Sequence, residues 1–247
     1  MRLNGKAAIV TGGASGFGAG IVRKFVAEGA RVMIADLNGE AAAALADELG
    51  EAAVACAVDV AKGESVDAMR DAALKAFGRV DILVNNAGVT HLPTPMEEIS
   101  EEDFDRVAAV NMKSVYLTAR ALVPHMKEKG GAILNVASTA GLSPRPRLSW
   151  YNASKGWMIT ATKSMAVELA PSQLRVNAIC PVAGETPLLK SFMGEDTPET
   201  RAKFLSTIPI GRFSTPEDMG NAACFLCSDE ASMVTGVAME VDGGRCV

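Results

Sequence analysis

The sequence predicts an α/β fold in which helices cover both faces of a parallel sheet. Short apolar, β-branched segments alternate with helical patterns along all 247 residues, an order typical of βαβ units. These segments lack the polar alternation of a half-exposed sheet, which favours strands buried on both faces. Several of them end in Gly, Asp or Asn, at the sheet edge where such folds bind ligands.

Each element follows from a local pattern. Continuous apolar runs of four to eight residues, bounded by turn residues, predict the strands: they fall at 6–11, 31–35, 52–58, 80–84, 131–137, 174–180 and 237–241. Apolar residues at helical spacing predict the helices: they fall at about 18–28, 38–49, 64–77, 100–129, 151–170 and 216–228. Residues 181–211 are irregular, with a short helix expected near 197–205, and a loop of this length is usually a lid or binding element.

Composition narrows the class of protein. A net charge of −5 argues against a nucleic-acid or membrane-surface role. No apolar run approaches the roughly 18 residues needed to cross a bilayer, and no signal-peptide pattern precedes the first strand, so we expect a cytoplasmic protein. No linker divides the chain, which predicts one domain over 1–247. The pair Cys224 and Cys227 lacks further zinc ligands and lies in an apolar helix, so we expect inert thiols and no metal.

A glycine-rich turn follows the first strand and opens the first helix. Gly12, Gly16 and Gly18 lie in this turn, where the backbone can approach a pyrophosphate at the helix N-terminus. The second strand ends in Asp36, which can accept hydrogen bonds from ribose hydroxyls and would repel a 2′-phosphate. Because Ser15 is uncharged and so is Leu37, the pattern favours NAD over NADP. Asp36 could also serve only as an N-cap of the next helix.

Tyr151 and Lys155 are spaced one helical turn apart. A phenol keeps its proton up to a pH of about 10, and a nearby ammonium would lower that pKa and make the tyrosine a usable acid or base. The alternative is an ordinary exposed pair. Ser138 ends the fifth strand, 13 residues earlier, and could meet this pair at one site. Asn111 lies in a helix interior, where the simple alternative is a surface asparagine.

These motifs, in this order and spacing, resemble the short-chain dehydrogenases/reductases over essentially the whole chain. The matching segments are Thr11–Gly18, Asp36, Asp59, Asn85–Gly88, Asn111, Ser138, Tyr151, Lys155 and Val241–Gly244. The resemblance implies a Rossmann-type, doubly wound sheet of seven parallel strands with helices on both faces. It also implies hydride transfer with a nicotinamide cofactor, a small alcohol or ketone substrate and a homo-oligomer, either a tetramer or a dimer.

The resemblance also implies residue roles. Tyr151 would exchange a proton with the substrate oxygen, Lys155 would lower its pKa and hold the ribose, Ser138 would steady the developing alkoxide, and Asn111 would bind a relay water. The residues expected to bind the cofactor are Gly12, Ser15, Gly16, Phe17, Gly18, Asp36, Leu37, Asp59, Val60, Asn86, Ala87, Gly88, Tyr151, Lys155, Pro181, Val182 and Thr186. The chain departs from the family at Val182, where a glycine is usual, and Gly184 could compensate.

The substrate pocket is the least defined part of the sequence. The residues expected to contact substrate are Ser138, Arg145, Arg147, Trp150, Tyr151 and Leu188. An apolar lining is expected from Leu92, Leu142, Leu148, Leu188, Phe192 and Met193. A guanidinium suits an anionic group, so one of the two arginines could bind an anionic substrate. Both could equally be surface or subunit-interface residues.

The leading hypothesis is therefore NAD-dependent oxidation of a secondary alcohol, or the reverse. A sugar dehydrogenase and a 3-oxoacyl-thioester reductase both fit that chemistry, although the latter usually takes NADPH in this family. A cofactor-binding protein without catalysis is the alternative of a different class.

Overall fold

The computed structural model describes residues 1–247, with Lys190 described only by its place in a helix. Seven parallel strands form one sheet in the order β3-β2-β1-β4-β5-β6-β7, which confirms the predicted fold class. The strands are β1 Ala7–Thr11, β2 Arg31–Asp36, β3 Ala53–Ala57, β4 Ile82–Asn85, β5 Gly131–Val136, β6 Leu174–Pro181 and β7 Ala238–Val241. The strand order reverses at β1, which pairs with both β2 and β4, and such a switch point opens a crevice at the sheet edge.

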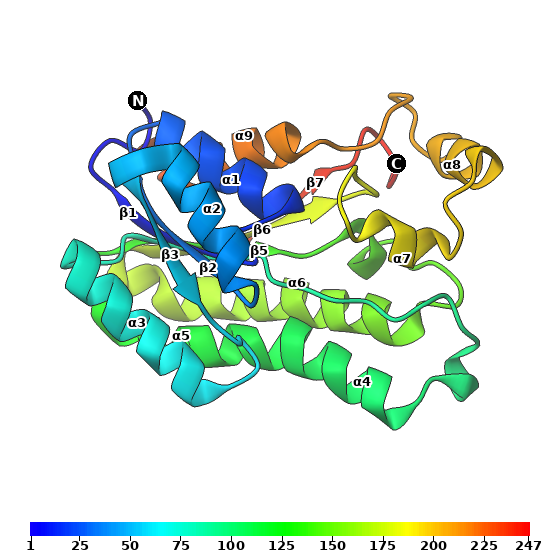
Figure 1. The fold of residues 1–247 in the computed structure, drawn as a ribbon, viewed down its shortest axis with the longest axis horizontal. Helices are drawn as coiled ribbons and strands as arrows, with labels where there is room; N and C mark the ends of the chain where they lie inside the picture. The colour runs from blue at the N-terminus through cyan, green and yellow to red at the C-terminus, as the bar shows by residue number, and fades with distance from the viewer.

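Helices cover the sheet on both faces (Figure 1). Helices α1 (Gly16–Ala27), α2 (Gly39–Leu49) and α9 (Pro216–Cys227) lie on one face, and α3 (Gly63–Phe77), α5 (Ser114–Met126) and α6 (Ser149–Leu169) lie on the other. Each face has its own apolar core: Phe25 of α1 and Met219 of α9 belong to one, and Met69 of α3 and Leu122 of α5 to the other. The described residues include no helix long and apolar enough to cross a bilayer.

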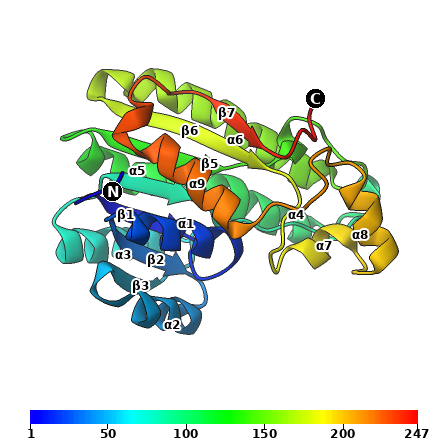
Figure 2. The ribbon, with the colours of Figure 1, turned by 90° about the horizontal axis from the view of Figure 1, so that it is seen from above.

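Two short helices, α7 (Leu189–Met193) and α8 (Pro198–Leu205), lie together beyond one end of the sheet (Figure 2). They come from the segment that the sequence left irregular. The sequence predicts α8 near its true position but misses α7, because five residues are too few to show helical periodicity. Thr197 begins α8, its hydroxyl accepting from the Thr200 N–H.

The predicted helix at 100–129 is divided by a wider turn. Helix α4 spans Glu101–Ala108, a π-helical segment follows at Ala109–Lys113, and α5 begins at Ser114. Ser100 caps α4, with its hydroxyl accepting from the Asp103 N–H at 3.1 Å. A π-helical turn is rare and is often found at functional sites, and this one contains Asn111.

Helices α1 and α9 pack through glycines. A Cβ atom added at Gly20 would lie 2.2 Å from the Pro216 carbonyl oxygen, and one at Gly220 would lie 2.7 Å from the Gly20 carbonyl oxygen. Both clashes are with backbone, which cannot turn aside as a flexible side chain can. The two helices can approach this closely only because both positions lack a side chain.

We expect Gly20→Ala to destabilise the fold by about 1–3 kcal/mol through overpacking. For a chain of this size that lowers the melting temperature by roughly 2–4 °C per kcal/mol, which thermal unfolding would measure. Gly156→Ala is the control, because its Cβ would lie 3.7 Å from the nearest atom, the Gly141 carbonyl oxygen. It should leave the melting temperature unchanged or raise it; equal melting temperatures for all three proteins would contradict the packing argument.

Candidate active site

A cavity of about 460 Å³ lies at the carboxyl ends of the strands. This volume is within the usual range for small-molecule sites. Every residue that the sequence assigned to the cofactor lines it: Gly12, Ser15, Gly16, Phe17, Gly18, Asp36, Leu37, Asp59, Val60, Asn86, Ala87, Gly88, Tyr151, Lys155, Pro181, Val182 and Thr186. Ser138 lines the same cavity, so the glycine turn and the Tyr–Lys helix face one space.

The glycine turn is shaped by close backbone contacts. Gly12 has a φ of +60°, and a Cβ there would lie 2.9 Å from the Cα of Ala87. A Cβ at Gly18 would lie 2.0 Å from the Gly12 carbonyl oxygen. The Asn86 amide donates to the carbonyl oxygens of Thr11 and Gly12 at 2.9 Å each and so ties the turn to β4.

The N-terminus of α1 fits an anionic group. Ser15 occupies the N-cap position, but its hydroxyl makes no capping hydrogen bond, so it does not take up the first-turn N–H groups of α1. These N–H groups, at the positive end of the helix dipole, are suited to a pyrophosphate.

Asp36 lies at the cavity edge with both carboxylate oxygens fixed by the backbone. One oxygen accepts from the Ala14 N–H and the other from the Asn38 N–H, each at 3.0 Å. The alternative role of Asp36 as an N-cap is wrong, because the Asn38 side chain caps α2 by accepting from the Ala41 N–H. The next strand delivers Asp59, whose pKa is held low by the Ala61 N–H and by Lys62.

Tyr151 and Lys155 are both buried on the cavity side of α6, so the exposed-pair alternative is wrong. The Lys155 Nζ donates to the Val136 carbonyl oxygen at 2.8 Å and lies 5.9 Å from the centre of the Tyr151 ring. Burial lowers the pKa of Lys155 to about 8. Burial also raises the pKa of Tyr151 to about 12, opposed by the Ser138 hydroxyl and the charge of Arg145. This net direction is opposite to the lowering by Lys155 that the sequence predicts, because desolvation of the phenolate dominates.

Ser138 follows β5 with an extended backbone. Its Oγ accepts from the Ala140 N–H at 3.1 Å, which fixes the oxygen and leaves the hydroxyl proton available to a ligand. Ser138 and Tyr151 line the same cavity, and the Ser138 hydroxyl opposes the rise in the pKa of Tyr151.

Asn111 is fully buried, which excludes the surface alternative. Its amide exchanges two hydrogen bonds with the backbone of Val89, both 2.9 Å, and donates to the Ser154 hydroxyl at 3.0 Å. A Cβ added at Gly88 would lie 3.4 Å from the Lys155 Nζ and 3.5 Å from the Asn111 Oδ1. The amine and the amide oxygen therefore border a common space that Gly88 leaves open.

Local packing accommodates Val182, which stands where the family usually has a glycine. Val182 is buried against Leu189, Ile208 and Phe213 in a small apolar cluster. Gly184 is the position that needs a glycine, since a Cβ there would lie 2.2 Å from the Phe17 ring.

At the Tyr151 end the cavity is mostly apolar. The Phe192 ring packs edge-on against Tyr151, with centroids 5.1 Å apart. The lining here comprises Ala140, Arg145, Leu148, Leu188, Phe192 and Phe204.

Several predicted substrate contacts lie elsewhere. Arg147 is exposed and points its guanidinium at the Pro93 carbonyl oxygen, 3.4 Å away. Trp150 packs on Phe104 and donates to the Met96 carbonyl oxygen, so neither residue lines the cavity. The lining also excludes three of the predicted apolar residues: Leu92, Leu142 and Met193. Arg147, Trp150 and Leu142 are misplaced because sequence proximity to Tyr151 does not say which way a loop turns.

Several lining residues were not singled out from the sequence, among them Val89, Val110, Val136, Ala140, Pro187 and Phe204. Phe204 is the most informative, because α8 brings it back over the cavity from a position 53 residues beyond Tyr151 in the chain. The only available signal was an aromatic residue, followed by Leu205, at the end of a short and mostly polar helix.

The five cysteines are free, and burial raises the pKa of Cys227 to about 12, as expected for inert thiols. Within the described residues, no group of three or more His, Cys, Asp or Glu side chains could hold a metal ion.

Comparison with known proteins gives long matches. Residues 12–245 match the family model described as enoyl-(acyl carrier protein) reductase. The 4-formylbenzenesulfonate dehydrogenase of Comamonas testosteroni is 51% identical over 250 residues, covering 99% of each chain.

Two solved structures are also similar. A 3-ketoacyl-(acyl-carrier-protein) reductase from Brucella melitensis, complexed with NADH, is 51% identical with a TM-score of 0.95, covering 99% of this chain and 100% of the other. A 7α-hydroxysteroid dehydrogenase complexed with NADH and 7-oxo glycochenodeoxycholic acid is 37% identical with a TM-score of 0.93, covering 98% and 95%. With the motifs in one cavity and these full-length matches, the chain belongs to the short-chain dehydrogenase/reductase family, whose members named here are oxidoreductases acting on CH–OH groups or their carbonyl counterparts.

Proposed function

We propose that this protein is an NAD(H)-dependent oxidoreductase that interconverts an alcohol and its carbonyl compound. The observation that carries the proposal is one cavity lined both by the glycine turn with Asp36 and by Ser138, Tyr151 and Lys155. A protein that only binds the cofactor has no chemical need for the second group of side chains.

The residues of the cavity fit a nicotinamide dinucleotide. The uncapped start of α1 suits the pyrophosphate, and Asp36 suits the ribose hydroxyls. The NADH in two similar solved structures supports the same cofactor here. When bound, the nicotinamide supplies the hydride acceptor in alcohol oxidation and the hydride donor in carbonyl reduction.

The chain supplies proton transfer and orientation. The Ser138 hydroxyl donates to the substrate oxygen and steadies the negative charge that develops on it. Tyr151 exchanges a proton with that oxygen. Lys155 and Asn111 border the space left by Gly88, where a water molecule would connect the buried amine to the solvent. Phe192 packs edge-on against the Tyr151 ring and would help to shield the reacting oxygen from water.

A 3-oxoacyl-thioester reductase is the second candidate. The solved structure that carries a 3-ketoacyl reductase name is 51% identical and holds NADH, so Asp36 does not count against this activity. The 51% identical dehydrogenase of an aromatic aldehyde supports the first candidate equally. Acetoacetyl thioester reduction, compared with oxidation of simple alcohols, separates the two.

We also propose that the protein is a cytoplasmic homo-oligomer. The five free cysteines are typical of a reducing compartment. Tyr116 on α5 and Trp157 on α6 are partly exposed beside a shallow depression, as expected of a surface that meets another copy. Light scattering of the purified protein distinguishes an oligomer from the 25.7 kDa chain.

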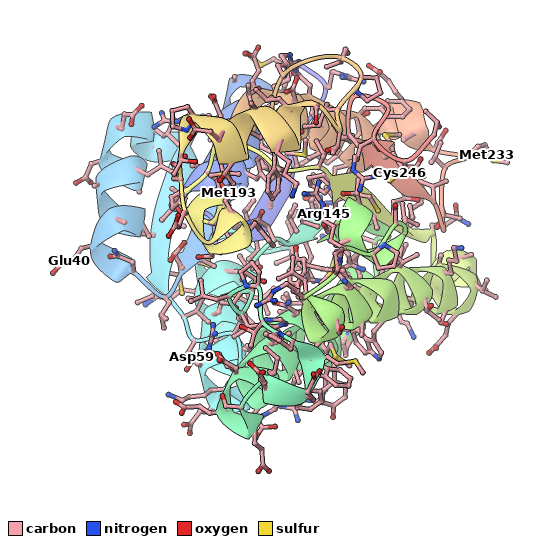
Figure 3. All side chains as sticks on the ribbon, turned by 90° about the vertical axis from the view of Figure 1, so that its right-hand side faces the viewer. Glu40, Asp59, Arg145, Met193, Met233 and Cys246 are labelled. Atoms are coloured by element: carbon pink, nitrogen blue, oxygen red, sulfur yellow. The ribbon has the colours of Figure 1, made fainter. Side chains whose placement is uncertain are left out.

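The first test is NADH formation across a panel of neutral and anionic alcohols, with NAD or NADP supplied in parallel. We expect turnover with NAD, and we expect Asp36→Ser to raise the kcat/KM ratio of NADP to NAD by about tenfold or more, because it removes a like charge next to the 2′-phosphate. Glu40→Ser is the control, since Glu40 is exposed at the outer face of α2 (Figure 3). A wild-type preference for NADP, or an unchanged ratio in the Asp36 variant, would contradict the assignment.

Tyr151→Phe should lower kcat by about 100- to 10,000-fold, the range expected when a general acid–base group is lost. NADH affinity, measured by fluorescence titration, should stay nearly unchanged because only a hydroxyl is removed. The matched control is Tyr116→Phe, which alters the only other tyrosine, an exposed one. Equal turnover in both variants would show that Tyr151 is not the proton-transfer group.

Alcohol oxidation should accelerate with pH. The oxidation needs the deprotonated form of Tyr151, whose pKa lies near 12, so its fraction grows about tenfold per pH unit below that value. Carbonyl reduction needs the protonated form, which already predominates, and its rate should not rise. Initial rates of both directions between pH 7 and 10 test this, and an oxidation rate that falls with pH would count against Tyr151 as the base.

A further inference from the structure

We propose that the substrate carries a carboxylate or sulfonate group in addition to its reacting oxygen, and that Arg145 binds this anion. The inference rests on the proposed function, because it names the substrate class of the same cavity. Arg145 lies in the loop between residues 142 and 148, ahead of α6, and lines the cavity near Tyr151. In Figure 3 it lies between Met193 of α7 and Cys246 near the C-terminus.

The guanidinium of Arg145 has no anionic partner among the described residues, although it is half-buried. Most arginines of this protein have one. Those paired with a carboxylate are Arg2, Arg23, Arg70, Arg79, Arg106, Arg120, Arg201 and Arg212. A partly desolvated charge without a counter-ion is unfavourable, so an anionic ligand at this position would be stabilising.

Phe204 holds the guanidinium in place. The central carbon of Arg145 lies 4.5 Å from the centre of the Phe204 ring, a distance at which a guanidinium stacks on an aromatic face. Stacking occupies the face of the planar group and leaves its N–H donors at the edge. These donors match the two oxygens of a carboxylate or sulfonate.

A second positive charge reinforces the site. Arg245 reaches the same loop, with its Nη1 3.5 Å from the Ser143 Oγ, and burial together with the charge of Arg245 lowers the pKa of Arg145. The Nε of Arg245 is buried and lacks a hydrogen-bond partner within the described part of the chain. Asp242 forms no ion pair with either arginine within the described residues: its carboxylate oxygens accept from the backbone N–H groups of Gly244 and Cys246. An anion next to Arg145 would offset the repulsion between these two positive charges.

The wall between Tyr151 and Arg145 defines the rest of the ligand. Leu148, Leu188 and Phe192 line this end of the cavity, and all are apolar. The substrate class is therefore an alcohol or ketone joined to its anionic group by an apolar, aromatic or aliphatic spacer. A polyhydroxylated neutral sugar would bring no counter-charge for the guanidinium and would place hydroxyls against this apolar wall.

Binding of matched probes to the enzyme–NADH complex tests the inference without requiring turnover. The probes are 4-acetylbenzenesulfonate and 4-acetylbenzenesulfonamide, which share a shape but differ in charge at pH 7. Isothermal titration should show the sulfonate binding about tenfold or more tightly than the sulfonamide, as expected of a charge-assisted pair. Arg145→Met should remove this preference, and Arg145→Lys should retain part of it.

Arg147→Met is the matched control, because it removes the same charge from the same loop but outside the cavity. It should keep the wild-type preference. Equal affinity of wild type for both probes, lack of binding by both, or an unchanged preference in Arg145→Met would overturn the inference. Thermal unfolding and NADH affinity of each variant establish that it is folded.

The two proposals fail in different ways. NAD-dependent turnover of neutral alcohols, with no preference for the sulfonate, would overturn the role of Arg145 and leave the proposed function in place. A clear sulfonate preference that depends on Arg145, without turnover of any alcohol or ketone, would overturn the proposed function alone.

Discussion

The site depends on the close contact between the glycine turn after β1 and the end of β4. At this contact, Thr11 and Asn86 cross-link two strands that are 75 residues apart in the chain. The Thr11 hydroxyl accepts from the N–H groups of Asn86 and Ala87, and the Asn86 amide returns two hydrogen bonds to the turn. Because the strand order reverses here, the same contact closes the floor of the crevice. A side chain at Gly12 would separate the two strands, and the start of α1 would lose its orientation toward the cavity.

Burial shifts the pKa values of the two titrating groups of α6 in opposite directions. It favours the neutral phenol of Tyr151 and the neutral amine of Lys155, and each shift is a cost of taking a charge out of water. The structure offsets part of that cost: Lys155 donates a hydrogen bond to the Val136 carbonyl oxygen, and the Ser138 hydroxyl opposes the rise in the pKa of Tyr151. Desolvation also strengthens every charge interaction inside the cavity. A tyrosine that is inert in isolation can therefore become reactive when a positive charge enters beside it.

The sequence predicted the sheet, six major helical regions and a set of proposed cofactor residues that all line one cavity, because those depend on local patterns. Strand ends of a parallel sheet share one edge, so Asp36, Asp59 and Ser138 had to meet there. The errors arise where a residue's direction is set by tertiary packing. Arg145 and Arg147 are two residues apart, yet one lines the cavity and the other faces Pro93; Arg147 has a φ of +66°, a conformation that no pattern foretells. Phe204 and α7 escaped for a similar reason, since their segments are too short to carry periodicity.

The two ends of the cavity are built from different kinds of structure. The groups assigned to cofactor and proton transfer stand on strand ends and on the long helix α6, where small displacements would break several hydrogen bonds at once. The groups around the substrate come from the loop before α6 and from α7 and α8, which pack through one small apolar cluster and aromatic contacts. Substitution at the second end can alter which molecule binds without disturbing the first. Arg145 lies at the substrate end of the cavity, and none of the described residues there supplies an anionic partner for its charge.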